Sequence, residues 1–308
     1  MIKQFNSLQE LMVAFRRPEA AIAHFTAIRW KNGKFCPHCG HDKIYSIKSS
    51  PKAPRYKCAQ CRVHFSITVG TIFENTKLPL RVWFGAIWLI TNHKKGIAST
   101  TLATDLDITQ KSAWFVLHRL RHAARTQSFN KPLSGIVEID ETFIGGKARN
   151  KHIDKRGKGG AAGAVGKAIV VGAIERKGNV VARVVENTRS ETLEGFVRAT
   201  VSPDAEMVVT DQGKGYQNLG EEYSHAVINH ARGHYVDGDV HTQSIESVWA
   251  LLKRQIIGIH HWVSPKHLAR YVEEMTWRMN RRAMTGQERV NALFSAVEGR
   301  LTYKALIA

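Results

Sequence analysis

The sequence predicts an α/β protein, in which a mixed sheet flanked by helices follows a small metal-stabilised ribbon and a helical region. Three observations support this prediction. Four cysteines form two C-x2-C pairs near the N-terminus, apolar residues recur at helical spacing on both sides of these pairs, and from residue 136 the spacing changes to that of strands. A chain of 308 residues is expected to form about two domains.

The first element, residues 1–34, is predicted to be a helical segment. Ser7 and Glu10 have the spacing of a capping box, in which each side chain satisfies a backbone N–H group of the first turn. Apolar residues then recur at helical spacing up to about residue 30.

The second element, residues 35–75, is predicted to be a zinc ribbon. Each C-x2-C turn can direct two thiolates at one point, so two such turns complete a tetrahedral Zn²⁺ site. Two disulfides or four unrelated thiols are the alternatives, but the regular spacing and a reducing compartment favour one structural Zn²⁺. His38 and His41 lie near enough in sequence to replace a thiolate. The predicted ligands are Cys36, Cys39, Cys58 and Cys61.

The third element, residues 76–130, is predicted to be helical and to bind DNA. A short helix, the turn "DLDIT" and a longer basic helix over about 110–125 form the pattern of a helix-turn-helix. An ordinary helical hairpin is the alternative, since this motif has no fixed residues. The expected DNA contacts on the longer helix are Lys111, Arg119, Arg121 and Arg125.

The fourth element, residues 131–290, has the pattern of a ribonuclease H-like domain. Three strands are predicted at 136 onward, 168–175 and 180–186, followed by a helix from Ser190. A strand that ends at Asp211, a fifth strand near 225–230 and a long helix over about 242–257 complete the order. Three strands, helix, strand, strand, helix is the order of that fold. Residues 291–308 are expected to form a C-terminal tail.

Acidic residues fall where such a domain can use them. The stretch "EIDET" places Asp140 in the first strand, Asp211 closes the fourth, and Glu246 lies in the first turns of the long helix. A solvated strand end is the simpler explanation of this stretch. Carboxylates gathered from three elements can instead hold two Mg²⁺ or Mn²⁺ ions for phosphodiester chemistry. Glu138 shares the strand face of Asp140, whereas Glu141 is expected to point away.

The positive net charge of the chain points to a polyanionic partner. The formal net charge is +19, and cations that contact phosphates release condensed counterions. An anionic membrane surface is the alternative, but the longest apolar run, residues 82–90, is well short of the about 20 residues that cross a bilayer. No signal-peptide core is evident near the N-terminus, so we expect a cytoplasmic protein.

Further DNA contacts are expected near the acidic residues. Residues 145–167 are rich in Gly, Lys and Arg and are predicted to form a flexible basic loop that clamps DNA. On the long helix, a solvated basic face is the alternative to DNA contact. The expected contacts are Lys147, Arg149, Lys155, Arg156 and Lys158 in the loop, with Lys253 and Arg254 on the helix.

Three blocks that follow the ribbon resemble the DDE transposases of bacterial insertion sequences. They are "VEIDETFIGGK", "VVTDQGKGYQNL" and "HTQSIESVWALLKRQIIGIHHWVSPKHLARYVEEMTWRMNRR". Within these, the chain resembles the group with an N-terminal zinc ribbon, over about residues 20–285. Gln243 departs from the Asn expected in such a run. The resemblance implies that Asp140, Asp211 and Glu246 are the catalytic triad.

The resemblance also implies a reaction and partners. Such proteins bind the terminal inverted repeats of their element in double-stranded DNA, cleave the 3′ ends and transfer them to target DNA. Joining two ends implies a homodimer or a larger synaptic assembly. A ribonuclease H-like nuclease without strand transfer is one alternative. A DNA-binding regulator with an inactive catalytic domain is another, although all three acids are present.

Overall fold

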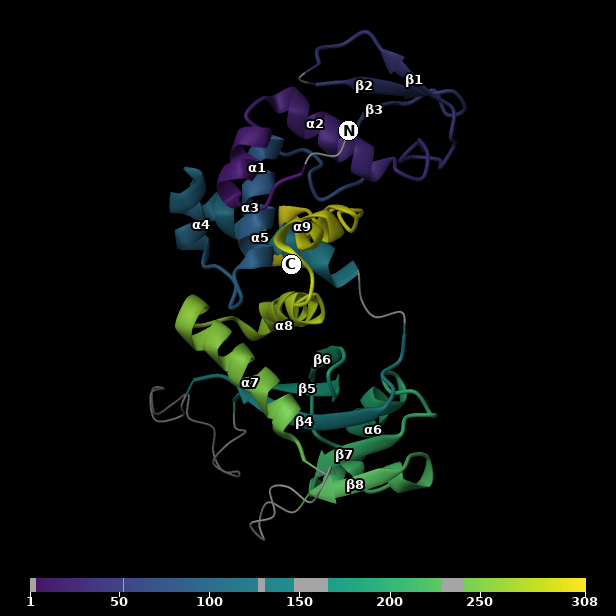
Figure 1. Cartoon of the computed structure of the whole chain (residues 1–308), viewed down its shortest axis with the longest axis vertical. Coiled ribbons are helices and arrows are strands. Elements are labelled where there is room, and N and C mark those ends of the chain that lie inside the picture. The colour runs from purple at the N-terminus through teal and green to yellow at the C-terminus, as the bar shows by residue number, and fades with distance from the viewer. Residues whose placement is uncertain (1–3, 52, 127–130, 147–165, 229–240) are drawn as a thin grey trace. The chain divides into compact units, whose positions relative to one another are not determined.

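The computed structural model describes residues 4–51, 53–126, 131–146, 166–228 and 241–308 (Figure 1). The chain forms two compact units. The first contains residues 1–127 and 283–308, and the second contains residues 128–282. No helix within the described residues is long and apolar enough to cross a membrane.

The first unit begins with helices that pack around aromatic side chains. They are α1 (Leu8–Ala14), α2 (Pro18–Arg29) and α3 (Leu80–Asn92). The Ser7 side chain accepts from the Glu10 backbone, and the Glu10 carboxylate accepts from the Asn6 backbone. Helix α3 is buried on most of its surface, which explains its continuous apolar run.

The ribbon consists of three short antiparallel strands in the order β1-β2-β3. They are β1 (Ile44–Ile47), β2 (Arg55–Cys58) and β3 (His64–Ser66). Tyr56 and Phe65 are paired across the sheet and buried, and the Trp30 ring packs against Tyr56. This core is small, which fits a module that depends on a metal.

Two helices follow in the region predicted to be a helix-turn-helix, α4 (Ser99–Leu106) and α5 (Gln110–Thr126). Asp107 ends α4 in the left-handed conformation, with φ at 51°. The Thr109 hydroxyl then accepts from the Ser112 backbone and so caps the start of α5.

The C-terminal residues differ from the expected tail. They form α9 (Gly286–Phe294) and α10 (Tyr303–Ile307), and they belong to the first unit. Phe294, Val297 and Leu301 are buried, and Phe294 packs edge-on against Phe84 of α3. Phe294 ends α9, Val297 and Leu301 lie between α9 and α10, and all three complete the core of the first unit.

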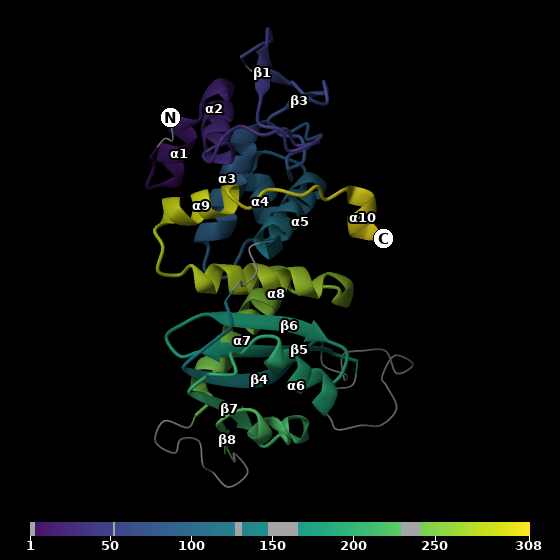
Figure 2. The same ribbon diagram turned by 90° about the vertical axis from the view of Figure 1, so that its right-hand side faces the viewer.

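The second unit is built on a five-stranded mixed sheet in the order β6-β5-β4-β7-β8 (Figure 2). Neighbours β4, β5 and β6 are antiparallel, whereas β7 and β8 run parallel to β4. The strands are β4 (Ile136–Ile144), β5 (Ala168–Glu175), β6 (Val180–Val185), β7 (Met207–Asp211) and β8 (His225–Ile228). The predicted element order and ribonuclease H-like class are confirmed.

Helices cover both faces of this sheet. Helix α6 (Ser190–Arg198) packs on one face with the short 3-10 turns Lys214–Tyr216 and Leu219–Glu221. Helices α7 (Gln243–Gln255) and α8 (Pro265–Asn280) pack on the other, and the π-helical turn Ile256–His260 joins them. Along β4, Val137 and Ile139 face α6, whereas Ile144 faces α7.

Candidate active site and zinc centre

The three predicted catalytic acids come from adjacent elements of the second unit. Asp140 lies within β4, Asp211 is the last residue of β7, and Glu246 lies in the first turn of α7. The parallel pairing of β4 with β7 matches Glu138 with Val209. The pairing ends there, and Asp140 and Asp211 lie two residues further along their strands, near enough that the charge of Asp211 raises the pKa of Asp140.

The three carboxylates lie near enough for their charges to act on one another, although their oxygens do not form a compact metal-type cluster in the described part of the chain. Burial raises the pKa of Asp140 to about 6, and the negative charges of Asp211 and Glu246 add to the rise. Mutual repulsion of this kind is relieved by a bound cation, and carboxylate oxygens are the ligands that Mg²⁺ and Mn²⁺ prefer. Carboxylates are therefore the right residue types for a hard divalent cation, although their oxygens are not gathered into one ligand cluster here.

The Asp140 carboxylate is also held by α7. The indole N–H of Trp249 donates to Asp140 Oδ2 at 2.9 Å. The indole fits because β5 has Gly172 opposite Asp140; a Cβ atom there would lie 2.5 Å from Trp249 Cη2. Neither Trp249 nor Gly172 is among the predicted site residues, although a glycine inside a strand often marks a close approach.

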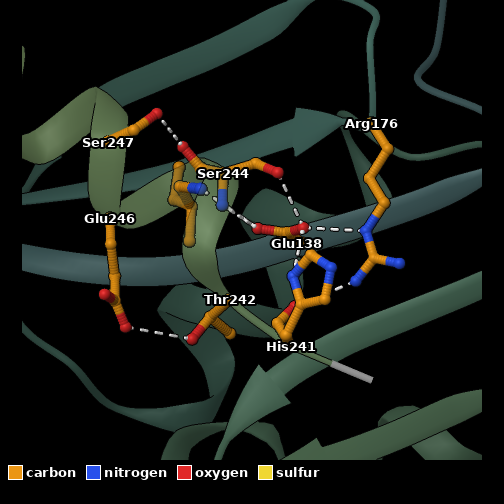
Figure 3. A network of polar contacts seen from close by, with 8 residues as sticks. Glu138, Arg176, His241, Thr242, Ser244, Glu246 and Ser247 are labelled. Atoms are coloured by element: carbon orange, nitrogen blue, oxygen red, sulfur yellow. Dashed lines mark hydrogen bonds and ion pairs between the residues drawn. The ribbon is translucent and has the colours of Figure 1, made fainter. Parts of the chain in front are cut away.

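Glu138 ties the start of α7 to β4 (Figure 3). This carboxylate is 0% exposed. Its Oε2 accepts from the backbone N–H groups of Ser244 at 2.7 Å and Ile245 at 3.1 Å. Its Oε1 accepts from the Ser244 hydroxyl at 2.9 Å and from Arg176 Nε at 2.8 Å. A carboxylate at a helix N-terminus satisfies backbone donors and complements the helix dipole.

Arg176 and His241 close this network. Arg176 also donates to the His241 carbonyl at 3.1 Å, and His241 Nδ1 lies 3.3 Å from Glu138 Oε1. The next residue, Thr242, donates its hydroxyl to Glu246 Oε1 at 3.3 Å. Contacts that begin at Glu138 thus reach the Glu246 side chain through the segment that leads into α7 (Figure 3).

Glu141 points away from Asp140, as expected from strand alternation, but it is not a surface acid. It accepts from the Tyr216 hydroxyl at 2.6 Å on the opposite face of β4. Burial raises the pKa of Glu141 to about 7; the Tyr216 bond lowers it, and the charges of Asp211 and Asp140 raise it. A fourth acid therefore contributes to the negative potential here.

The four cysteines of the ribbon converge on one point. Their Sγ atoms all lie within 4.8 Å of one another, with Cys36 and Cys61 3.7 Å apart and Cys39 and Cys58 3.6 Å apart. Thiolates around a tetrahedral Zn²⁺, about 2.3 Å from it, would be separated by roughly 3.8 Å. The cysteines form no disulfide. His38 and His41 do not belong to the group, which is the one metal-type cluster found in the described part of the chain.

Both knuckles have the same backbone. The residue after the second cysteine of each pair is left-handed, Gly40 at φ 77° and Arg62 at φ 61°. In the first knuckle, the Cys36 carbonyl accepts from Gly40 N, and Cys36 Sγ accepts from His38 N at 3.4 Å. Backbone donors to sulfur stabilise a thiolate.

Two of the arginines predicted to contact DNA are structural instead. Arg119 is 6% exposed and donates to the backbone carbonyls of Ile72 at 2.8 Å and Leu301 at 3.1 Å. Arg121 is 1% exposed. We correct the prediction for both, because their helix face packs into the first unit.

The other predicted DNA contacts divide into two sets. Lys111 and Arg125 on α5, and Lys253 and Arg254 on α7, are exposed. The basic residues of the expected loop lie outside the described residues: Lys147, Arg149, Lys155, Arg156 and Lys158.

Comparison with known families finds a matching domain over each of these two regions of the chain. Residues 132–280 match the ISXO2-like transposase domain, and residues 18–64 match the transposase zinc-ribbon domain. A Halobacterium salinarum protein, described as an uncharacterized protein in transposable element ISH50, is 28% identical over 276 residues, covering 86% of this chain and 92% of that protein. The resemblance to insertion-sequence transposases is confirmed.

Proposed function

Because the chain carries an ISXO2-like transposase domain behind a transposase zinc ribbon, we propose that it is a DNA transposase. It binds the terminal inverted repeats of its element, cleaves their 3′ ends and transfers them to target DNA. The observation that supports this most directly is that Asp140 in β4 is buried and that the charges of Asp211, at the end of β7, and Glu246, in the first turn of α7, reach it.

The proposed catalytic residues are these three carboxylates. Two Mg²⁺ or Mn²⁺ ions bound by them would activate the attacking hydroxyl and stabilise the leaving oxygen. The chain itself fixes the orientation of the ligands. Trp249 holds Asp140, the Gly213 backbone N–H donates to Asp211 Oδ1 at 3.0 Å, and Thr242 donates to Glu246.

DNA contacts are proposed for the exposed cations. Lys111 and Arg125 would contact the element ends from α5, and Lys253 and Arg254 would contact the strand near the carboxylates. The ribbon holds one structural Zn²⁺ and presents further Lys and Arg side chains. Since two ends must be joined, the active form is proposed to be a homodimer or a larger synaptic assembly.

The proposal is tested with supercoiled plasmid, which requires no knowledge of the repeats. Purified protein is incubated with plasmid in Mn²⁺ or Mg²⁺, beside Asp211→Ala. The matched control is Asp204→Ala, which removes an exposed aspartate from the same unit. Wild type and Asp204→Ala should nick the plasmid only with the cation, and Asp211→Ala should not.

Equal nicking by wild type and Asp211→Ala would contradict the assigned triad. Once a working carboxylate site is established, DNA that carries the element ends separates transposase from nuclease. Joining of labelled ends to plasmid supports the transposase, whereas end cleavage without joining indicates a nuclease.

A further inference from the structure

A cavity of about 410 Å³ opens in the second unit beyond the carboxylates. Its walls come from the last residues of β4, the C-terminal part of α7 and the turn that follows. Its lining includes Phe143, Lys253, Ile257, His261 and Trp262. No Asp or Glu lines it.

Two large apolar side chains of this cavity are unusually exposed. Trp262 is 68% exposed and Ile257 is 67% exposed. Exposed apolar surface at the rim of a cavity commonly marks a binding site.

The backbone that presents Trp262 is irregular. The π-helical turn Ile256–His260 ends α7, and His261 follows with φ at 60°, in the left-handed region. The Trp262 backbone N–H donates to the His260 carbonyl at 2.7 Å. Such turns and such backbone angles are costly and concentrate at functional sites.

The cavity is connected to the carboxylates by two elements that run in the same direction. Contacts of Glu138 with Ser244 and of Asp140 with Trp249 show that β4 and α7 proceed side by side. From Asp140, β4 reaches Phe143 in three residues, roughly 10 Å. From Glu246, α7 reaches Lys253 in seven residues, or two turns and roughly 10 Å on the same helix face.

We propose that this cavity binds an unpaired nucleobase of the DNA strand held at the carboxylates, two or three nucleotides from the reacting phosphate. A base presents flat apolar faces that stack on aromatic side chains such as Trp262. Lys253 and His261 lie where the phosphates beside that base would pass, and a chain of net charge +19 favours such a polyanion. A spacing of roughly 10 Å corresponds to about three nucleotides at 3.4 Å each.

The inference rests on the proposed function for the position of the DNA strand, but its test does not require catalysis. Binding of the full-length, zinc-loaded protein to a fluorescent 20-nucleotide single strand of mixed sequence is measured without Mg²⁺ or Mn²⁺. Trp262→Ala is compared with Trp262→Phe and with Val227→Ala. The last removes an exposed apolar side chain elsewhere in the same unit, where Val227 is 49% exposed.

Trp262→Ala should weaken single-strand binding by about fivefold to 150-fold, the range for loss of one stacked base. Trp262→Phe should retain most of the affinity, and Val227→Ala should match wild type. Binding to a blunt duplex should stay within about twofold, because paired bases cannot enter the cavity. Lys253→Ala should lower the slope of log affinity against log salt by about 0.7.

Single-strand binding by Trp262→Ala within about twofold of wild type would overturn the proposal. A change from oligomer to monomer in sedimentation, with DNA binding intact, would assign this surface to a second copy of the chain instead. Photocrosslinking of a 5-iodouracil strand should label Trp262, and labelling only elsewhere would also overturn it. Failure of both plasmid nicking and cleavage of DNA that carries the element ends would refute the proposed function and leave these binding results to decide the base site.

Discussion

The role of Glu138 can be tested by Glu138→Gln. The substitution keeps the shape of the side chain but replaces one acceptor oxygen with an NH2 group. Either orientation of the amide places this donor against existing donors: Arg176 Nε and the Ser244 hydroxyl on one side, or two backbone N–H groups on the other. The start of α7 would therefore lose part of its attachment to β4.

The magnitude follows from the burial of this network. The Glu138 side chain is 0% exposed and its Arg176 partner 17% exposed, so solvent screens the pair weakly. Breaking a buried pair by changing one partner costs about 3 kcal/mol at the lower end of the usual range. For a unit of this size, that loss should lower the melting temperature by roughly 6–12 °C.

The effect on activity should be separable from the effect on stability. Glu246 lies in the same first helical turn that Glu138 holds, and a misplacement of about 1 Å can reduce a rate by about 100-fold. We expect Glu138→Gln to nick plasmid about 100-fold more slowly, at a temperature where it remains folded. The Mg²⁺ concentration for half-maximal rate should also rise, because a displaced Glu246 binds the cation less well.

Glu194→Gln provides a matched control. Glu194 is 4% exposed and accepts from the Asn218 backbone and from Arg198, away from the carboxylates. It should lower the melting temperature but leave the nicking rate and its Mg²⁺ dependence unchanged. If Glu138→Gln behaves as this control does, Glu138 contributes to stability alone, and our account of α7 is refuted.

Three further predictions concern the same sites. Gly172→Ala should displace the Trp249 indole from Asp140 and slow nicking at least tenfold, measured beside Gly195→Ala, where the added Cβ meets nothing within 4 Å. Cys58→Ser should abolish binding of one Zn²⁺ per chain, measured by metal analysis, and should unfold the ribbon, measured by circular dichroism. Binding of a structural Zn²⁺ contributes about 10–16 kcal/mol to the folding free energy of such a module. Without Mg²⁺ or Mn²⁺, unfolding free energy should fall as pH rises from about 4 to about 6, because the raised pKa of Asp140 makes the folded state bind the extra proton. Added Mg²⁺ should reduce this fall, measured by calorimetry.

Much of the fold follows from local patterns. The strand at 168–175 and the helix that begins at Ser190 have the predicted positions, because period-two and helical apolar spacing persist across each element. The cysteine pairs likewise carry their geometry locally, since each C-x2-C turn needs only its own left-handed residue. The predicted acids lie on β4, β7 and α7 because the element order, which local patterns predict, fixes which elements become neighbours in the sheet.

The errors and omissions have one physical cause, which is a partner distant in sequence. In the sequence Arg119 resembles a surface cation on a basic helix, yet its guanidinium donates hydrogen bonds to the backbone carbonyls of Ile72 and Leu301. Trp249 resembles an ordinary core residue of an amphipathic helix, yet its N–H holds Asp140, 109 positions away. Apolar spacing reports how much of a side chain is buried, but not which polar atom it meets there. Gly172, inside the apolar run "AIVVGAIE", is the one local sign of the contact between Trp249 and Asp140. A glycine inside a strand often marks a position where another group approaches the backbone closely.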